Sequence, residues 1–71
     1  MKFELFDDMG VMVIGTRKKC IEALIEWFNS SEARGLYSRS ERLEFISNTR
    51  SLSTEDFDIL HVAGFTIRKK I

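Results

Sequence analysis

Proline is absent from this chain of 71 residues and 8.3 kDa, and cysteine and histidine occur once each. A lone Cys20 cannot close a disulfide framework, and Cys20 with His61 cannot supply the roughly four ligands of a tetrahedral zinc site. The composition therefore predicts no metal and no other cofactor, and the lack of cysteine pairs favours a reducing, cytoplasmic location. Without proline, turns depend on Gly, Asn, Asp and Ser, and exposed sheet edges depend on charge for protection.

Long hydrophobic runs are also absent. The longest run, at residues 11–14, is the size of a strand and far below the roughly 18–20 residues that a membrane span requires. The first residues lack the apolar stretch and the cleavage site of a signal peptide. We therefore expect no membrane partner.

The chain has the composition of a soluble globular domain, with 44% hydrophobic and 31% charged residues. Eleven basic and eleven acidic side chains give a formal net charge of zero. The length predicts a single small α+β domain over residues 1–71. A chain this short buries only about 60% of the surface that its unfolded form exposes, so most apolar residues are committed to a small core.

The first half of the chain has a regular hydrophobic pattern. Residues 2–6 and 11–15 alternate as strands around a turn, which predicts an N-terminal β-hairpin. Thr16 then caps a helix over residues 17–32, and Gly35 is its expected stop. The buried stripe of this helix is expected to contain Cys20, Ile21, Leu24, Ile25 and Phe28.

Residues 36–49 fit two structures. Alternation would turn Leu43 and Phe45 inward from a strand. However, Ser38 with Glu41 three residues later is a capping-box pattern, which would start a helix. We favour the strand.

The last third of the chain is expected to form a helix and a strand. Ser53 caps the helix, the acids at residues 55–56 fill its first turn, and Gly64 ends it. A strand follows over residues 65–70. The expected fold is a small two-layer sandwich of order ββαβαβ, with two helices on one face of a three- or four-stranded mixed sheet. Its strand–helix–strand unit would be parallel and right-handed.

No catalytic motif is present in the sequence. Gly10 and Gly15 have the outer spacing of a phosphate-binding loop, but the residues between them are apolar and the Lys-Ser/Thr pair is missing. Cys20 is expected on the buried stripe of one helix and His61 on the solvent side of the other, so they do not form a nucleophile–base pair. We therefore expect no enzymatic activity.

The basic run at residues 17–19 breaks a local electrostatic rule. Cations in the first turn of a helix face the positive end of its dipole, at a cost of roughly 0.3–1 kcal/mol each. Two explanations fit this run. The side chains can extend into water, where the cost is small, or they can bind an anionic partner at the start of the helix. A second basic run at residues 68–70 either protects a sheet edge or extends the same basic surface.

Aromatic and arginine side chains supply further candidates for a binding surface, because both are common at the energetic centres of protein interfaces. We predict a small protein-binding module, an adaptor, inhibitor or regulatory subunit, that acts through a charged and aromatic surface. The predicted partner-binding residues are Arg17, Lys18, Lys19, Trp27, Arg34, Tyr37, Arg39, Arg42, Arg68, Lys69 and Lys70.

The alternative is a nucleic-acid-binding protein that uses the basic patches at residues 17–19 and 68–70. A sequence pI of about 6.6 argues against it, because nucleic-acid-binding domains usually have a pI above about 9. A homodimer is permitted by the expected strand edges. The net charge of zero arises because acidic and basic segments of the chain cancel. Whether a basic surface exists therefore depends on whether the two basic runs share one face.

Overall fold

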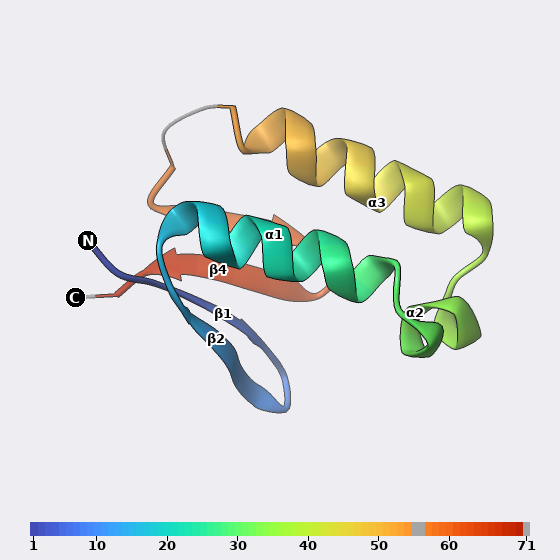
Figure 1. The fold of residues 1–71 in the computed structure, drawn as a ribbon, viewed down its shortest axis with the longest axis horizontal. Helices are drawn as coiled ribbons and strands as arrows, with labels where there is room; N and C mark the ends of the chain where they lie inside the picture. The colour runs from blue at the N-terminus through green and yellow to red at the C-terminus, as the bar shows by residue number, and fades with distance from the viewer. Residues whose placement is uncertain (55–56, 71) are drawn as a thin grey trace.

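The computed structural model describes residues 1–54 and 57–70, and these form four strands and three helices (Figure 1). The fold is α+β, as the sequence predicted. The elements are β1 (Phe3–Asp7), β2 (Gly10–Gly15), α1 (Arg17–Phe28), α2 (Ser31–Leu36), α3 (Arg39–Leu52), β3 (Ile59–Val62) and β4 (Phe65–Lys69). This ββαααββ order replaces the expected ββαβαβ order.

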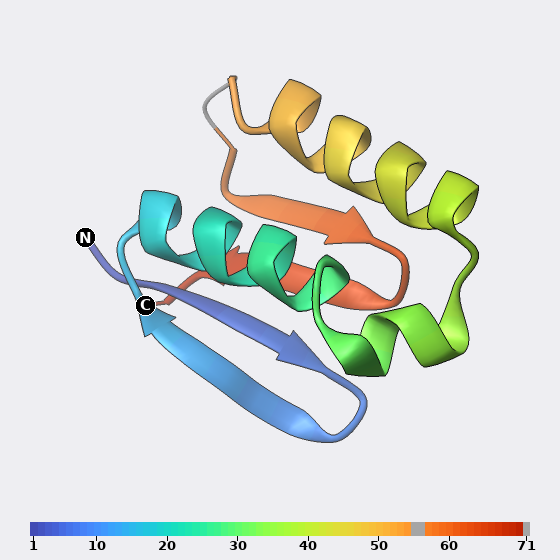
Figure 2. The same ribbon diagram turned by 45° about the vertical axis from the view of Figure 1, so that its right-hand side comes forward.

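The described strands form one sheet in the order β2-β1-β4-β3 (Figure 2). The pairs β1–β2, β1–β4 and β3–β4 are all antiparallel. The expected mixed sheet with a parallel unit is therefore wrong. The chain leaves the sheet at one edge, after β2, and returns at the other edge, in β3. The three helices form the connection between β2 and β3.

The N-terminal hairpin and the first helix confirm the sequence pattern. Gly10 has a φ of +124° beside the β1–β2 turn, a conformation that favours glycine. The Thr16 hydroxyl accepts a hydrogen bond from the Lys19 backbone N–H at 3.1 Å, which is the predicted cap. The helix ends at Phe28, earlier than expected, and the predicted stop Gly35 lies inside α2.

Residues 39–52 form α3, where we favoured a strand. The capping box is complete, because Ser38 Oγ accepts a hydrogen bond from the Glu41 N–H at 3.2 Å and Glu41 Oε1 accepts one from the Ser38 N–H at 2.9 Å. Ile46 is buried, whereas Leu43, expected to point inward, is 53% exposed. Local capping therefore outweighs a short stretch of apolar alternation.

Strand β3 occupies a segment where we expected the second helix. Burial alternates along it: Leu60 and Val62 are buried, and Ile59 and His61 are exposed. This period of two is the pattern of a strand with one face on the core. His61 is exposed as expected, but it lies on a sheet and not on a helix.

The β3–β4 connection is a two-residue turn. Ala63 and Gly64 have φ values of +50° and +86°, as a type I′ hairpin turn requires. Gly64 therefore belongs to a hairpin and does not end a helix. Ser53 lies at the C-terminal cap of α3 and does not begin a helix, and the acids expected in that helix's first turn lie outside the described residues.

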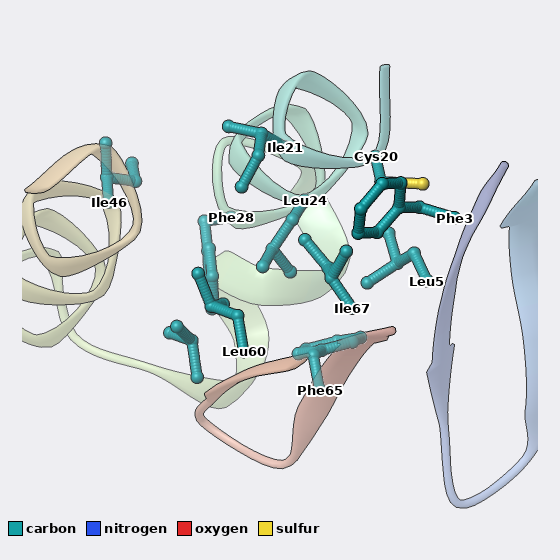
Figure 3. Packing of buried hydrophobic residues seen from close by; sticks show 11 residues of the cluster. Phe3, Leu5, Cys20, Ile21, Leu24, Phe28, Ile46, Leu60, Phe65 and Ile67 are labelled. Atoms are coloured by element: carbon teal, nitrogen blue, oxygen red, sulfur yellow. The ribbon is translucent and has the colours of Figure 1, made fainter. Parts of the chain in front are cut away.

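One face of the sheet packs against α1 and α3, and the core lies between them. Figure 3 shows Leu24 and Phe28 of α1 pointing toward Leu60 of β3 and Ile67 of β4. None of the helices in the described part of the chain is long and apolar enough to cross a membrane. The buried cluster consists of Phe3, Leu5, Cys20, Ile21, Leu24, Phe28, Ile46, Leu60, Val62, Phe65 and Ile67.

Candidate functional site

The two basic runs lie at the same end of the molecule. Phe3 of β1 pairs with Gly15 of β2 on one side and with Lys69 of β4 on the other, so the start of α1 and the end of β4 are brought together. Figures 1 and 2 show both segments beside the chain termini. The other predicted residues lie toward the opposite end, in the last turn of α1, in α2 and at its C-terminal cap, and in the first turn of α3.

Arg17 is part of the packing of the fold. Its guanidinium carbon lies 4.9 Å from the centroid of the Phe3 ring and 5.2 Å from that of Phe57. The guanidinium also donates a hydrogen bond to the Phe57 carbonyl oxygen at 3.4 Å. This half-buried side chain therefore ties the first turn of α1 to β1 and to the segment before β3.

Lys18 and Lys19 are exposed. The Lys18 ammonium is 4.0 Å from a carboxylate oxygen of Glu22, but both side chains are mostly in water, and such a pair contributes little. The stem of Lys19 crosses the end of β2, because a Cβ added at Gly15 would lie 2.8 Å from its Cδ atom. Two of the three cations in this turn are thus presented to solvent beside the sheet.

Arg68 is engaged within the sheet. Its guanidinium donates a hydrogen bond to Glu4 at 2.6 Å and lies 4.8 Å from the centroid of the Phe6 ring. Lys69 is half-buried, while Lys70 is exposed and its backbone N–H donates to the Lys2 carbonyl at 2.8 Å. Arg68 and Lys70 are therefore exposed to solvent, but the charge of Arg68 is paired with Glu4.

Trp27 lies at the edge of the core within an aromatic cluster. Its ring centroid is 4.7 Å from that of Phe65 and 6.4 Å from that of Tyr37, and its indole N–H donates to Glu32 at 2.8 Å. Trp27 and Tyr37, both half-buried, line a shallow groove together with the acidic β1–β2 turn.

The arginines near this cluster differ in exposure. Arg34 and Arg39 are exposed, in α2 and at the start of α3. Arg42 is half-buried, and its Nε atom has no hydrogen-bond partner among residues 1–54 and 57–70. At this end the predicted aromatic residues, Trp27 and Tyr37, pack against the core, whereas the predicted Arg34 and Arg39 are exposed.

One face of the sheet is left uncovered by the helices, and Arg68 is the only predicted partner-binding residue in the described strands that lies on it. We call this face the open sheet face. Strand register places two rows of side chains on it. Its apolar members Val11, Ile14 and Ile59, on the two outer strands, are 55%, 43% and 51% exposed. The rows are Ile14, Glu4, Arg68 and Ile59, followed by Val11, Phe6, Thr66 and His61.

A signal for this face was present in the sequence. Once Phe3 and Leu5 are assigned to the core, strand alternation turns Glu4 and Phe6 to the opposite side. The apolar residues on the outer strands could not be assigned to the same face, because β3 was taken for a helix.

Cys20 and His61 lie on opposite sides of the sheet. Cys20 is fully buried, and burial raises the pKa of its thiol although the Gly15 backbone and Lys19 act in the opposite direction. The His61 Nδ1 atom is 3.1 Å from the Thr66 hydroxyl on the open sheet face. The described residues contain no cluster of His, Cys, Asp or Glu that could hold a metal ion.

No protein-family model, curated protein or solved structure matches this chain. Its surfaces therefore supply the chemistry from which a function is inferred.

Proposed function

We propose that this chain is a small, non-enzymatic protein-binding module that acts through the open sheet face. The observation that supports it is the exposure of Val11, Ile14 and Ile59 on one uncovered side of the sheet. Val11 and Ile14 lie together on β2 beside Phe6, and Ile59 lies on β3, across the Glu4–Arg68 pair on the same face. Single exposed apolar side chains are common on protein surfaces, but several on one uncovered face are typical of interaction sites. An adaptor, an inhibitor and a regulatory subunit, at a cytoplasmic location, all belong to this class.

The charges on this face favour a partner that presents carboxylates around an apolar patch. Glu4 is covered by Arg68 and therefore contributes little negative potential to solvent. Lys2 and Lys70 follow the same strand alternation as Glu4 and Arg68, and both are exposed. Complementary charge at the rim of an interface directs association and selects between partners.

The size of the chain is compatible with such a complex. A standard interface buries about 800 Å² on each partner. This is about a sixth of the 4891 Å² of accessible surface, so one face of the domain is sufficient.

Site-specific photo-crosslinking tests the proposal. A photoreactive residue at position 59 samples the open sheet face, and one at position 43 is a matched control, because Ile59 and Leu43 have nearly equal exposure on different surfaces. In a lysate of the source organism we expect a discrete adduct with another protein from position 59 only. The adduct should disappear when Ile14→Lys is added. Identical adducts from both positions, or no adduct from position 59, would overturn the proposal.

Nucleic-acid binding is the second candidate, and the observation that favours it is the shared location of the two basic runs. Arg17 packs against aromatic rings and the exposed Arg68 is paired with Glu4, which leaves Lys18, Lys19 and Lys70 as the main contributors. Fluorescence anisotropy with single-stranded and duplex oligonucleotides should then show affinity that falls steeply with salt, and a weaker salt dependence in Lys18→Ala/Lys19→Ala. Binding that is independent of salt, or no binding at low salt, would exclude this candidate.

A further inference from the structure

Strand β2 forms an outer edge of the sheet that lacks the usual protection. It contains no proline and no charged residue, and Val11, Met12 and Ile14 are exposed. The unpaired backbone groups of such an edge are a template for another strand. A register shift near Met12 marks a β-bulge, which reduces this tendency without removing it. The opposite edge, β3, is shorter and packs beside α3.

The two ends of β2 have opposite charge. Asp7 and Asp8 lie at the turn before the strand, and Lys18 and Lys19 lie in the first turn of α1 directly after it. The stem of Lys19 crosses Gly15, so its ammonium group is close to the end of the strand. An uncharged apolar strand with an acidic start and a basic end is complementary to a second copy of itself in antiparallel orientation.

We propose that two copies of this chain associate by antiparallel pairing of their β2 strands. With the twofold axis at Met12, Gly15 of one copy lies level with Met9 of the other copy, next to its Asp8. The acidic turn of each copy then lies beside Lys18 and Lys19 of the other. Parallel pairing would instead place like charges together, at a cost to affinity.

This arrangement accounts for the two exposed cations in the first turn of α1. Their unfavourable position relative to the helix dipole is offset when carboxylates of the other copy lie close by. Because the twofold axis is perpendicular to the sheet, both open sheet faces lie on the same side of the extended sheet. The inference does not depend on the function proposed above, although a dimer would double that surface.

A charge-exchange experiment tests the pairing. The wild type should change from monomer to dimer with increasing concentration in sedimentation velocity, and added salt should weaken the dimer. Asp8→Lys and Lys19→Glu should each raise the dissociation constant about tenfold or more, because each places like charges together at both ends of the paired strands. An equimolar mixture of the two variants should restore a one-to-one dimer, since residue 8 of each copy again has the opposite charge to residue 19 of the other copy.

Two control variants make the same charge changes elsewhere. Glu44→Lys and Arg50→Glu alter exposed residues of α3 and should leave the dissociation constant unchanged. Circular dichroism checks that each variant is folded, and the salt titration of the wild type tests the same charges without any substitution. A wild type that stays monomeric at millimolar concentration would overturn the proposal. So would two monomeric, folded variants whose mixture does not dimerise, or loss of the dimer in the α3 controls.

Discussion

Replacement of Arg17 by alanine tells whether this side chain is an exposed cation or part of the packing of the fold, because the two arrangements predict opposite changes in the free energy of unfolding. If Arg17 were an exposed cation at the positive end of the helix dipole, its removal would raise the free energy of unfolding by roughly 0.3–1 kcal/mol. In the structure the guanidinium lies against the rings of Phe3 and Phe57. We therefore expect Arg17→Ala to lower the free energy of unfolding.

The magnitude follows from these contacts. A cation–π contact contributes about 0.5–1 kcal/mol at an exposed site and more when desolvated, so two contacts of a half-buried arginine contribute about 1–2 kcal/mol. The hydrogen bond to Phe57 is long, at 3.4 Å, and adds little. After the dipole cost of roughly 0.3–1 kcal/mol is subtracted, the expected net loss is about 1 kcal/mol.

Urea unfolding, followed by the fluorescence of Trp27 at low protein concentration, measures this change. Lys19→Ala is the matched control, because it removes an exposed cation from the same turn. This variant should raise the free energy of unfolding by roughly 0.3–1 kcal/mol. The dependence on urea concentration should be the same for both variants and the wild type. If Arg17→Ala were as stable as the wild type, or more stable, the packing role of this arginine would be refuted.

Other substitutions test the corrected second half of the fold and the buried thiol. Ser38→Ala removes the α3 cap and should lower the free energy of unfolding by about 0.5–2 kcal/mol, and no change in urea unfolding would contradict the capping box. Hydrogen bonds from Ser38 lower the pKa of Glu41. The stability that the charged Glu41 side chain contributes is therefore complete above the usual pKa of a glutamate, and it is lost as the pH falls through the lowered value. Glu41→Gln should accordingly differ from the wild type in thermal unfolding at neutral pH and converge with it in acid; a difference that persists in acid would disprove this linkage. Ala63→Asn should raise the free energy of unfolding by about 0.5–1 kcal/mol, because asparagine tolerates a φ of +50° better than alanine, and a loss of stability would argue against the type I′ turn. Cys20 should react with iodoacetamide only at the rate of unfolding, since it is buried and its thiol pKa is raised; rapid labelling of the native protein would show otherwise.

The sequence predicted the parts of the fold in which local signals agree. Thr16 and the apolar stripe of Ile21, Leu24 and Phe28 specify α1 by capping and by periodicity at once. In α3 the two signals disagreed, because Leu43 and Phe45 alternate like strand residues while Ser38 and Glu41 form a capping box. The box is satisfied in the structure, and Leu43 faces solvent.

The candidate surfaces were less predictable because they depend on contacts between distant residues. Arg17 and Phe57 are forty positions apart, so the burial of this cation could not be recognised from the basic run alone. Strand β3 was mistaken for a helix because acids after Ser53 are typical of a helix start. Without β3, the order of strands in the sheet was unknown. The open sheet face and the outer position of β2 therefore could not be predicted.

Amide hydrogen exchange at two protein concentrations tests the central claim that β2 pairs with a second copy. Amides of Gly10–Gly15 should become more protected as concentration rises, whereas amides of the opposite edge, Ile59–Val62, should not change. Protection of Gly10–Gly15 that is the same in dilute and concentrated samples, or a concentration effect confined to Ile59–Val62, would contradict it.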